Sequence, residues 1–181
     1  MGSVFSIIVR SLLIMMTTVR SWPGGGGGAF GGGCFMALAA DIVIAHKRAQ
    51  FGFGFAKRGL VPGGGSMTRL ARQIPYAKAM EILLTGDPMS AQEAHRCGFV
   101  NDVVPQDKVL ERAQEFATRL AKNGPLAIRK IKECVLTTSG LTINEAFAVE
   151  DRLSAEVIVS KDAREGPRAF VEKRDPNFTG A

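Results

Sequence analysis

Residues 21–42 read SWPGGGGGAFGGGCFMALAADI, and this stretch decides how the rest of the chain is interpreted. Eight of the ten residues from Gly24 to Gly33 are glycine, and an apolar run follows at once. The run between Gly32 and Ala40 predicts a helix that is apolar on every face and is therefore buried all round. The glycines leave the backbone bare at the point where this helix begins.

Bare backbone at the start of a helix suits the binding of negative charge. The first N–H groups of a helix have no internal partner, and the helix dipole adds a partial positive charge there. Glycine also lets a ligand atom approach the backbone closely. Gly31 to Gly33 therefore predict a site for an anion or a developing oxyanion, where one well-placed donor contributes about 3–4 kcal/mol to a transition state. The alternative is a flexible linker.

Two phosphate-binding motifs do not account for this stretch. No Lys-Ser or Lys-Thr pair follows the glycines, so the sequence does not form a P-loop. A dinucleotide-binding glycine motif needs a strand before it, and none is expected here.

The composition indicates one globular domain and gives no sign of a nucleic-acid partner. The 181 residues suffice for a real core. The net charge is +6, but the Lys and Arg residues are scattered without interleaved aromatic residues, which favours solvated helix faces and excludes nucleic-acid binding.

The cysteines and histidines indicate neither a disulfide framework nor a metal site. Cys34, Cys97 and Cys134 form no CxxC pair, and with only two histidines no zinc-ligand spacing appears. We therefore expect no bound metal and read the cysteines as buried free thiols. Such a set suits a reducing compartment, which is the cytoplasm, or the mitochondrial matrix if the source is eukaryotic.

The beginning of the chain is apolar over residues 4–22, and no acidic residue precedes Asp41. A transmembrane helix needs about 20 apolar residues. Arg10 and Arg20 interrupt this stretch, so no membrane span is expected. The features of a signal peptide are also missing, although an acid-free start with arginines is similar to a mitochondrial presequence. The apolar spacing predicts a packed helix over residues 5–20.

Further elements follow from local patterns. We expect a short buried strand at 41–46, a glycine-broken loop at 49–65, a helix at 66–74 capped by Ser66, and a helix at 77–86 that ends at Gly86.

Three capping boxes predict helix starts in the rest of the chain. In each, a first side chain and a glutamate three residues later satisfy backbone N–H groups; the pairs are Ser90 with Glu93, Thr142 with Glu145, and Asp162 with Glu165. Between the first two boxes we expect a strand at 99–104 and helices at 106–122 and 125–136. The chain is thus mixed α and β, with more helix in its second half.

Three ordered blocks resemble one known family. Residues 29–45, AFGGGCFMALAADIVIA, are similar to the oxyanion-helix segment of the crotonase superfamily, the enoyl-CoA hydratases and isomerases. Residues 49–105 are similar to the next block of that family, and DAREGPRAFVEKRDPNF at 162–178 resembles its closing helix. The resemblance covers roughly residues 29 to 181.

The resemblance implies an α/β fold and an acyl-CoA ligand. Residues 1–105 would form a partial core of crotonase-like ββα spiral turns, and residues 106–181 a helical region that packs a homotrimer or hexamer. Two backbone N–H groups would hold the thioester carbonyl, one of them at Gly32, with Gly31 and Gly33 beside the substrate. Coenzyme A would belong to the substrate, and no separate cofactor is implied.

The closing helix of the family contacts the adenine and phosphate region of coenzyme A, often across subunits. This role would fall on Phe170 and Lys173 in AFVEKR. The alternative for these residues is an ordinary amphipathic helix.

The chain departs from the family where proton chemistry is needed. Hydration requires a base that activates water and an acid that protonates the α-carbon, and the hydratases use two glutamates for this. Phe35 and Phe55 stand at those two positions, and a phenylalanine neither accepts nor gives a proton. Asp41 is the only acidic residue through residue 80, and we read it as a cap or turn residue.

A second departure lies ahead of the glycine turn. The family is normally longer at the N-terminus, so the chain is read as truncated there. The family also places a buried apolar strand before the GGG motif. Here Gly24 to Gly28 stand in its place, and each glycine inside such an element costs roughly 0.5–1 kcal/mol relative to alanine.

Three functions stay open at this point. The chain could be an enzyme of the hydratase/isomerase class, of the fatty-acid β-oxidation type, with weak or altered activity. It could be a non-catalytic acyl-CoA-binding protein in which Phe35 and Phe55 line an apolar slot. It could also serve mainly in assembly through its C-terminal helices.

Overall fold

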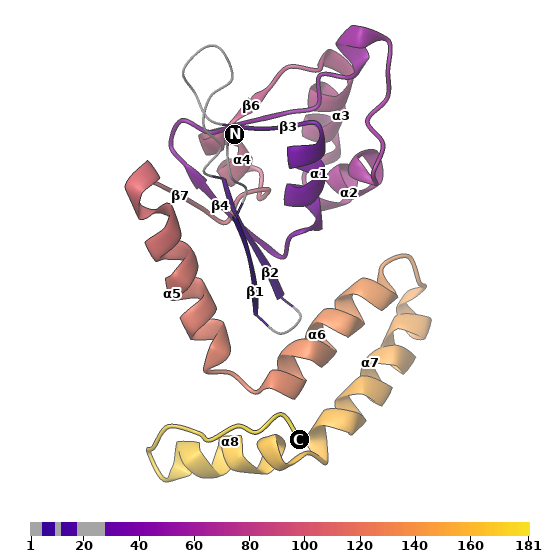
Figure 1. Cartoon of the computed structure of the whole chain (residues 1–181). Coiled ribbons are helices and arrows are strands. Elements are labelled where there is room, and N and C mark those ends of the chain that lie inside the picture. The colour runs from indigo at the N-terminus through magenta and orange to yellow at the C-terminus, as the bar shows by residue number, and fades with distance from the viewer. Residues whose placement is uncertain (1–4, 10–11, 18–27) are drawn as a thin grey trace. The chain divides into compact units, whose positions relative to one another are not determined.

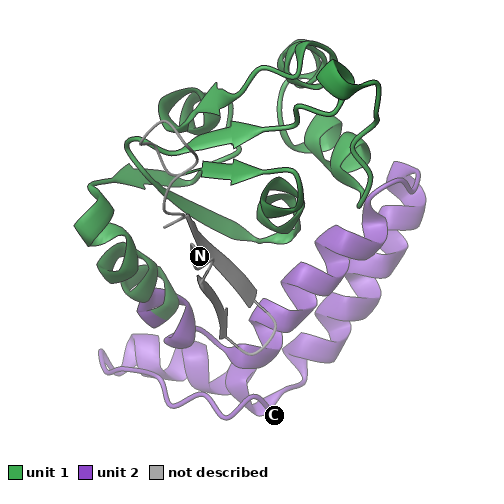
Figure 2. Cartoon of the chain, turned by 45° about the horizontal axis from the view of Figure 1, so that its top comes forward, with its two compact units in different colours: residues 1–117 green, residues 118–181 purple. Residues whose placement is uncertain are grey.

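The computed structural model describes the backbone of residues 5–9 and 12–17, and both backbone and side chains of residues 28–181. The chain divides into two compact units, residues 1–117 and residues 118–181 (Figure 2). The division falls inside helix α5 (Val109–Ala121). The predictions for Gly24 to Gly27 lie outside the described residues.

The first unit begins with a β-hairpin, so the helix predicted over residues 5–20 was wrong. Strands β1 (Phe5–Val9) and β2 (Leu12–Thr17) pair antiparallel, and β2 also pairs in parallel with β4 (Ile42–His46). An apolar run of this length is compatible with a strand or a helix. The partner strand β4 lies beyond residue 40, and the periodicity within residues 5–20 cannot reveal pairing with so distant a segment.

Two small sheets organise the first unit (Figure 1). The larger has the order β1-β2-β4-β7, in which β7 (Asp102–Val104) runs parallel to β4. In the smaller, β5 (Gln50–Gly52) lies between β3 (Gly28–Phe30), which is parallel to it, and β6 (Met89–Ser90), which is antiparallel. The predicted strand at 41–46 is thus confirmed from Ile42 onward as β4, whereas only the second half of the strand predicted at 99–104 is observed, as β7.

The loop predicted at 49–65 is only partly a loop. It contains β5 and a 3₁₀ helix, η1 (Ala56–Arg58). The side chain of Phe51 supplies the reason, because it is fully buried and packs edge-to-face on Phe99 with ring centroids 5.1 Å apart. Burial of one aromatic side chain outweighs the loop character of the flanking glycines.

The described part of the first unit also contains four complete α-helices and the first part of α5. The complete helices are α1 (Gly32–Ala39), α2 (Ser66–Gln73), α3 (Tyr76–Thr85) and α4 (Ala91–Arg96). Helix α1 begins where the sequence predicts, but it is not buried all round. Cys34, Ala37 and Leu38 form its buried face, which packs on β3 and α2, whereas Met36 is 47% exposed. Within the described unit, these neighbours cover only one side of the helix.

The predicted helix ends are right at Gly86 and wrong at Ser66. Gly86 adopts a φ of 67° and donates its N–H to the carbonyl of Ile82, closing α3. Ser66 is the first residue of α2 and not its cap, because Gly65 takes the cap position with a φ of 78°. The Ser66 hydroxyl donates instead to the preceding turn, at the carbonyl of Gly63.

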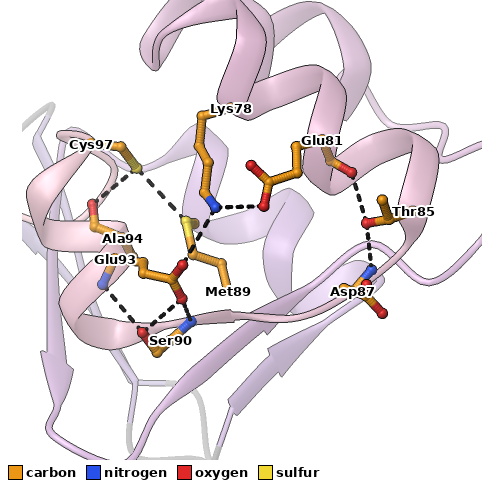
Figure 3. Close-up of polar contacts among 9 residues, drawn as sticks. All are labelled: Lys78, Glu81, Thr85, Asp87, Met89, Ser90, Glu93, Ala94 and Cys97. Atoms are coloured by element: carbon orange, nitrogen blue, oxygen red, sulfur yellow. Dashed lines mark hydrogen bonds and ion pairs between the residues drawn. The ribbon is translucent and has the colours of Figure 1, made fainter.

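The capping box at Ser90 and Glu93 is confirmed and belongs to a larger polar network (Figure 3). The Ser90 hydroxyl accepts the Glu93 N–H at 3.2 Å, and the Glu93 carboxylate accepts the Ser90 N–H at 3.1 Å. Lys78 of α3 binds Glu81 at 2.8 Å and Glu93 at 3.4 Å. The Ser90 hydrogen bonds lower the pKa of Glu93, and the Glu81 hydrogen bond raises the pKa of Lys78. The network ties α3 to the start of α4.

The second unit is helical, as expected for the second half of the chain; it contains the end of α5, α6 (Pro125–Thr138), α7 (Ile143–Ile158) and α8 (Lys161–Val171). Helices α6 and α7 pack against each other, and the box at Thr142 and Glu145 opens α7 as predicted. The helices predicted at 106–122 and 125–136 are observed as a short 3₁₀ turn, η2 (Gln106–Lys108), followed by α5, and as α6.

The capping box predicted at Asp162 and Glu165 is wrong. Ser160 caps α8 by accepting the Ala163 N–H at 3.0 Å. The buried carboxylate of Asp162 accepts N–H groups from Thr179 at 2.7 Å and Gly180 at 2.8 Å. Partners far along the chain therefore replace the local partner that the spacing predicts.

No helix in the described part of the chain is both long enough and apolar enough to traverse a membrane.

Candidate functional site

A glycine turn joins β3 to α1. Gly31 has a φ of 52° and a ψ of −116°, a backbone conformation that favours glycine. Its N–H donates to the carbonyl of Gly52 at 3.1 Å, which fixes the turn against the end of β5. Its own carbonyl accepts the Phe35 N–H at 3.1 Å and closes the first turn of α1. Backbone contacts thus hold the turn on both sides.

Gly32 is the first residue of α1 and is exposed. Its N–H has no acceptor inside the helix, and the helix dipole makes this end partly positive. A Cβ built on Gly32 would meet no atom within 4 Å among the described residues. Gly33 is more crowded, since a Cβ there would lie 3.4 Å from the Cβ of Ala29. The position with open space is therefore Gly32.

The structure explains why the last residue of the run Gly24 to Gly28 is a glycine. It begins β3, and a Cβ at this position would lie 2.5 Å from the carbonyl oxygen of Gln50. A side chain would therefore clash with the neighbouring strand β5. Contrary to the sequence interpretation, a short strand forms here, and close pairing requires glycine at its first residue.

Phe35 of α1 and Phe55 at the start of η1 meet beside this turn. Their rings stack with centroids 5.7 Å apart and an angle of 19° between the planes. A Cβ on Gly64 would lie 2.8 Å from the Phe35 ring, so the turn at residues 63–65 closes tightly over that ring. Two segments about 20 residues apart therefore place a continuous aromatic surface next to Gly31. The pair supplies no group that could transfer a proton.

An open hollow of about 420 Å³ adjoins the glycine turn. The ends of β3 and β5, the segment around η1 and the C-terminal end of α3 form it. The described residues that line it are Phe30, Gly31, Gly52, Gly54, Phe55, Lys57, Arg58, Leu60 and Gly86. Two of these lining residues are cations, the others are aromatic, aliphatic or glycine, and none is acidic.

The two cations of the hollow differ in their partners. Lys57 forms an ion pair with Asp87, which follows Gly86. Arg58 donates one guanidinium N–H to the carbonyl of Gly54 at 2.7 Å. Asp87 is further held by the polar network of α3, because its N–H donates to the hydroxyl of Thr85 at 3.1 Å (Figure 3).

The cysteine next to the turn is structural. Cys34 is fully buried, and its thiol donates to the carbonyl of Ala29 at 2.8 Å. Burial raises the pKa of this thiol to about 12, so it stays protonated and is a poor nucleophile near neutral pH. It secures the start of α1 on the end of β3.

The sequence-predicted site residues fall in both units. Gly31, Gly32, Gly33, Phe35 and Phe55 gather in the first unit around the start of α1. Phe170 and Lys173 belong to the second unit. The side chain of Phe170 is 84% exposed near the end of α8, and Lys173 follows with a φ of 54°.

Sequence reasoning missed the other walls of the hollow, among them Phe30, Arg58 and Gly86. No local pattern marks these residues, because they come together only through the pairing of β3 with β5 and the packing of α3 on η1. The described residues also contain no group of three or more His, Cys, Asp or Glu side chains that could hold a metal ion.

Solved structures identify this arrangement as a crotonase-type α/β fold. An enoyl-CoA hydratase from Mycobacterium tuberculosis H37Rv superposes with a TM-score of 0.83 at 41% sequence identity, covering 87% of this chain and 62% of that one. An enoyl-CoA hydratase from Bacillus anthracis gives a TM-score of 0.83 at 38% identity, covering 86% and 60%.

The family follows from sequence comparison. The family model described as enoyl-CoA hydratase/isomerase matches residues 26–181, and the chain belongs to this family. It is 44% identical over 150 residues to enoyl-CoA hydratase EchA19 of Mycobacterium tuberculosis, covering 83% of this chain. It is 42% identical over 156 residues to a carnitinyl-CoA dehydratase of Salmonella typhimurium, covering 84% of this chain. The chain spans 56% of the length of the first relative and 60% of the second.

Proposed function

We propose that this chain binds an acyl-CoA thioester at the turn Gly31–Gly33 and does not hydrate it. The observation that carries the proposal is the stacked pair of Phe35 and Phe55, with centroids 5.7 Å apart beside the glycine turn. The family resemblance assigns the acid and the base of hydration to these two positions. Two stacked phenylalanines favour an apolar acyl group and perform no proton transfer.

Binding would rest on the open end of α1. The Gly32 N–H donates to the thioester oxygen, and the partial positive charge of the helix end stabilises negative charge on it. The hollow next to Gly31 takes the acyl group against Phe30, Phe55 and Leu60. From the family resemblance we further propose that Phe170 and Lys173 contact the adenine and phosphate part of coenzyme A; Phe170 is an exposed aromatic residue and Lys173 is a cation.

Two measurements on the purified protein test this proposal together. Calorimetric titration with butyryl-CoA should give saturable binding, and crotonyl-CoA absorbance should not fall faster than in buffer. Hydration at an ordinary enzymatic rate would overturn the claim that the phenylalanines remove the chemistry. Absence of binding would overturn the acyl-CoA claim itself.

A weak or altered hydratase or isomerase reaction is the second candidate. The ion pair of Lys57 with Asp87 favours it, because this pair brings one carboxylate to the edge of the hollow. Under this second candidate, the wild type should slowly lower the absorbance of crotonyl-CoA. If Asp87 is the base, Asp87→Asn should abolish this slow change. An unchanged slow rate in this variant would exclude Asp87.

The helical unit supports a further role in assembly, as a homotrimer or hexamer. Helices α6 and α7 present exposed aliphatic side chains, among them Ile131, Val135 and Ile158, around a groove of about 520 Å³. Unpaired apolar surface of this kind marks an interaction face. The three cysteines are free thiols, but only Cys34 is buried as expected, whereas Cys97 and Cys134 are half-buried. Free thiols support the cytoplasm, or the mitochondrial matrix in a eukaryote, as the compartment.

A further inference from the structure

We infer that the hollow selects acyl groups that end in a carboxylate, and that Arg58 holds this carboxylate. The inference rests on the proposed acyl-CoA function, because it concerns the far end of the same acyl group. It follows from three observations: the charge of the hollow, the orientation of Arg58, and the position of the hollow next to the glycine turn.

The charge of the hollow is unbalanced and positive. Lys57 and Arg58 line it, and no lining residue among those described is acidic. Asp87 neutralises Lys57 through their ion pair. Arg58 has no carboxylate partner among the described residues, and its guanidinium group donates to the carbonyl of Gly54. The hollow therefore keeps one uncompensated cation.

The orientation of Arg58 suits a bidentate anion. One terminal N–H is fixed on the Gly54 carbonyl at 2.7 Å, which limits the freedom of the guanidinium group. A guanidinium group carries five N–H donors in a rigid plane, so donors remain for a ligand. Its planar fork matches the two oxygens of a carboxylate, and a partly immobilised side chain loses less entropy on binding.

The surrounding walls define the rest of the ligand. Phe30, Phe55 and Leu60 contribute apolar surface to the hollow that Gly31 and Arg58 also line. A chain of methylene groups fits such walls, whereas a carboxylate fits only next to the cation. Because Gly31 directly precedes Gly32, an acyl group whose carbonyl lies at the Gly32 N–H has this hollow beside it. The ligand class is thus a dicarboxylic acyl-CoA of short or medium length.

The test compares two six-carbon ligands that differ only at the far end, adipoyl-CoA and hexanoyl-CoA. Calorimetry on the wild type should show adipoyl-CoA bound about tenfold more tightly, as expected for one charge-assisted hydrogen-bonded pair. Arg58→Met should remove this preference, because it lowers the affinity for adipoyl-CoA far more than the affinity for hexanoyl-CoA. Arg58→Lys should keep part of the preference, because it preserves the charge without the fork. Arg72→Met, at an exposed position of α2 that does not line the hollow, should change neither affinity.

The other outcomes separate the two proposals. Equal affinity of both ligands for the wild type would overturn the role of Arg58 while acyl-CoA binding stands. An equal loss for both ligands in Arg58→Met would assign Arg58 to the coenzyme A moiety and overturn the inference. Binding of neither ligand by the wild type would overturn the acyl-CoA function, and the inference with it. Thermal unfolding of each variant shows whether it retains the fold.

Discussion

Phe35 and Phe55 change the site in two ways at the scale of single residues. In the proposed function they stand at the positions that the family resemblance gives to the acid and the base of hydration. Their stacked rings also fill space, since a Cβ on Gly64 would lie 2.8 Å from the Phe35 ring. Restoring proton chemistry therefore requires both rings to be replaced, because one remaining ring would keep the site apolar around a single carboxylate.

The double variant Phe35→Glu with Phe55→Glu should hydrate crotonyl-CoA at least about 100-fold faster than the wild type, because general acid–base catalysis typically contributes that much. Loss of crotonyl-CoA absorbance measures the rate. The matched control is the double glutamine variant, which has the same shape but no acid or base and should stay at the wild-type rate. A folded glutamate variant without a rate increase would contradict the placement of these two residues.

Local signals at the scale of elements predicted part of the fold. The boxes at Ser90 and Thr142 are confirmed, because each is closed within four residues and needs no distant partner. The box at Asp162 is wrong because Thr179 and Gly180 compete for its carboxylate. The first strands and the walls of the hollow were missed for the same reason, since both depend on pairing between distant segments.

The Ser90 box should stabilise the start of α4 measurably. Ser90→Ala removes the side-chain acceptor for the Glu93 N–H and should lower the free energy of unfolding by about 1 kcal/mol in urea titration. Thr142→Ala removes the equivalent acceptor at α7 and serves as a comparison of similar size. Because Glu93 also binds Lys78, a Ser90→Ala variant as stable as the wild type would mean that the ion pair alone holds α4.

Glu165 gives the second unit a pH-dependent contribution to stability. Hydrogen bonds from Arg174 and from the Asn177 N–H lower the pKa of this carboxyl from 4.5 to about 2. A lowered pKa in the folded state stabilises the fold above the unfolded value, and this stabilisation is lost as the pH falls from about 4.5 to about 2.

The variant Glu165→Gln tests this dependence by thermal unfolding at several pH values. The wild type should unfold at a higher temperature than the variant above pH 5, and the difference should vanish near pH 2. Arg174→Gln removes the main cause of the lowered pKa and should largely abolish the pH dependence. A difference between wild type and Glu165→Gln that is constant over this pH range would contradict the assignment.

At the scale of the whole molecule, the chain combines a site unit and a helical unit with exposed apolar side chains. The sequence predicted the mixed α and β class and the helical second half, because these follow from composition and periodicity. It did not predict the hollow at Arg58, because no periodicity relates Phe30 to Gly86.

The exposed face of α6 and α7 should support self-association. Sedimentation equilibrium should give three or six times the chain mass of 19.4 kDa. Ile131→Glu combined with Val135→Glu places charges on this face and should shift the protein toward the monomer, whereas Lys122→Glu at an exposed position outside the groove should not. A wild-type mass of one chain would contradict the assembly proposal.

The central claim is that the chain keeps a thioester clamp at Gly32 without proton chemistry, and one measurement addresses it directly. Butyryl-CoA labelled with ¹³C at the carbonyl reports polarisation of the thioester through its NMR shift. Gly32→Pro replaces the N–H at the first helical position, where proline is tolerated, by a ring carbon. Gly32→Ala keeps the N–H and adds a Cβ that meets no described atom within 4 Å. The carbonyl resonance should move downfield on binding to the wild type and to Gly32→Ala, and should stay at its free position with Gly32→Pro. The same downfield shift with Gly32→Pro would contradict the account.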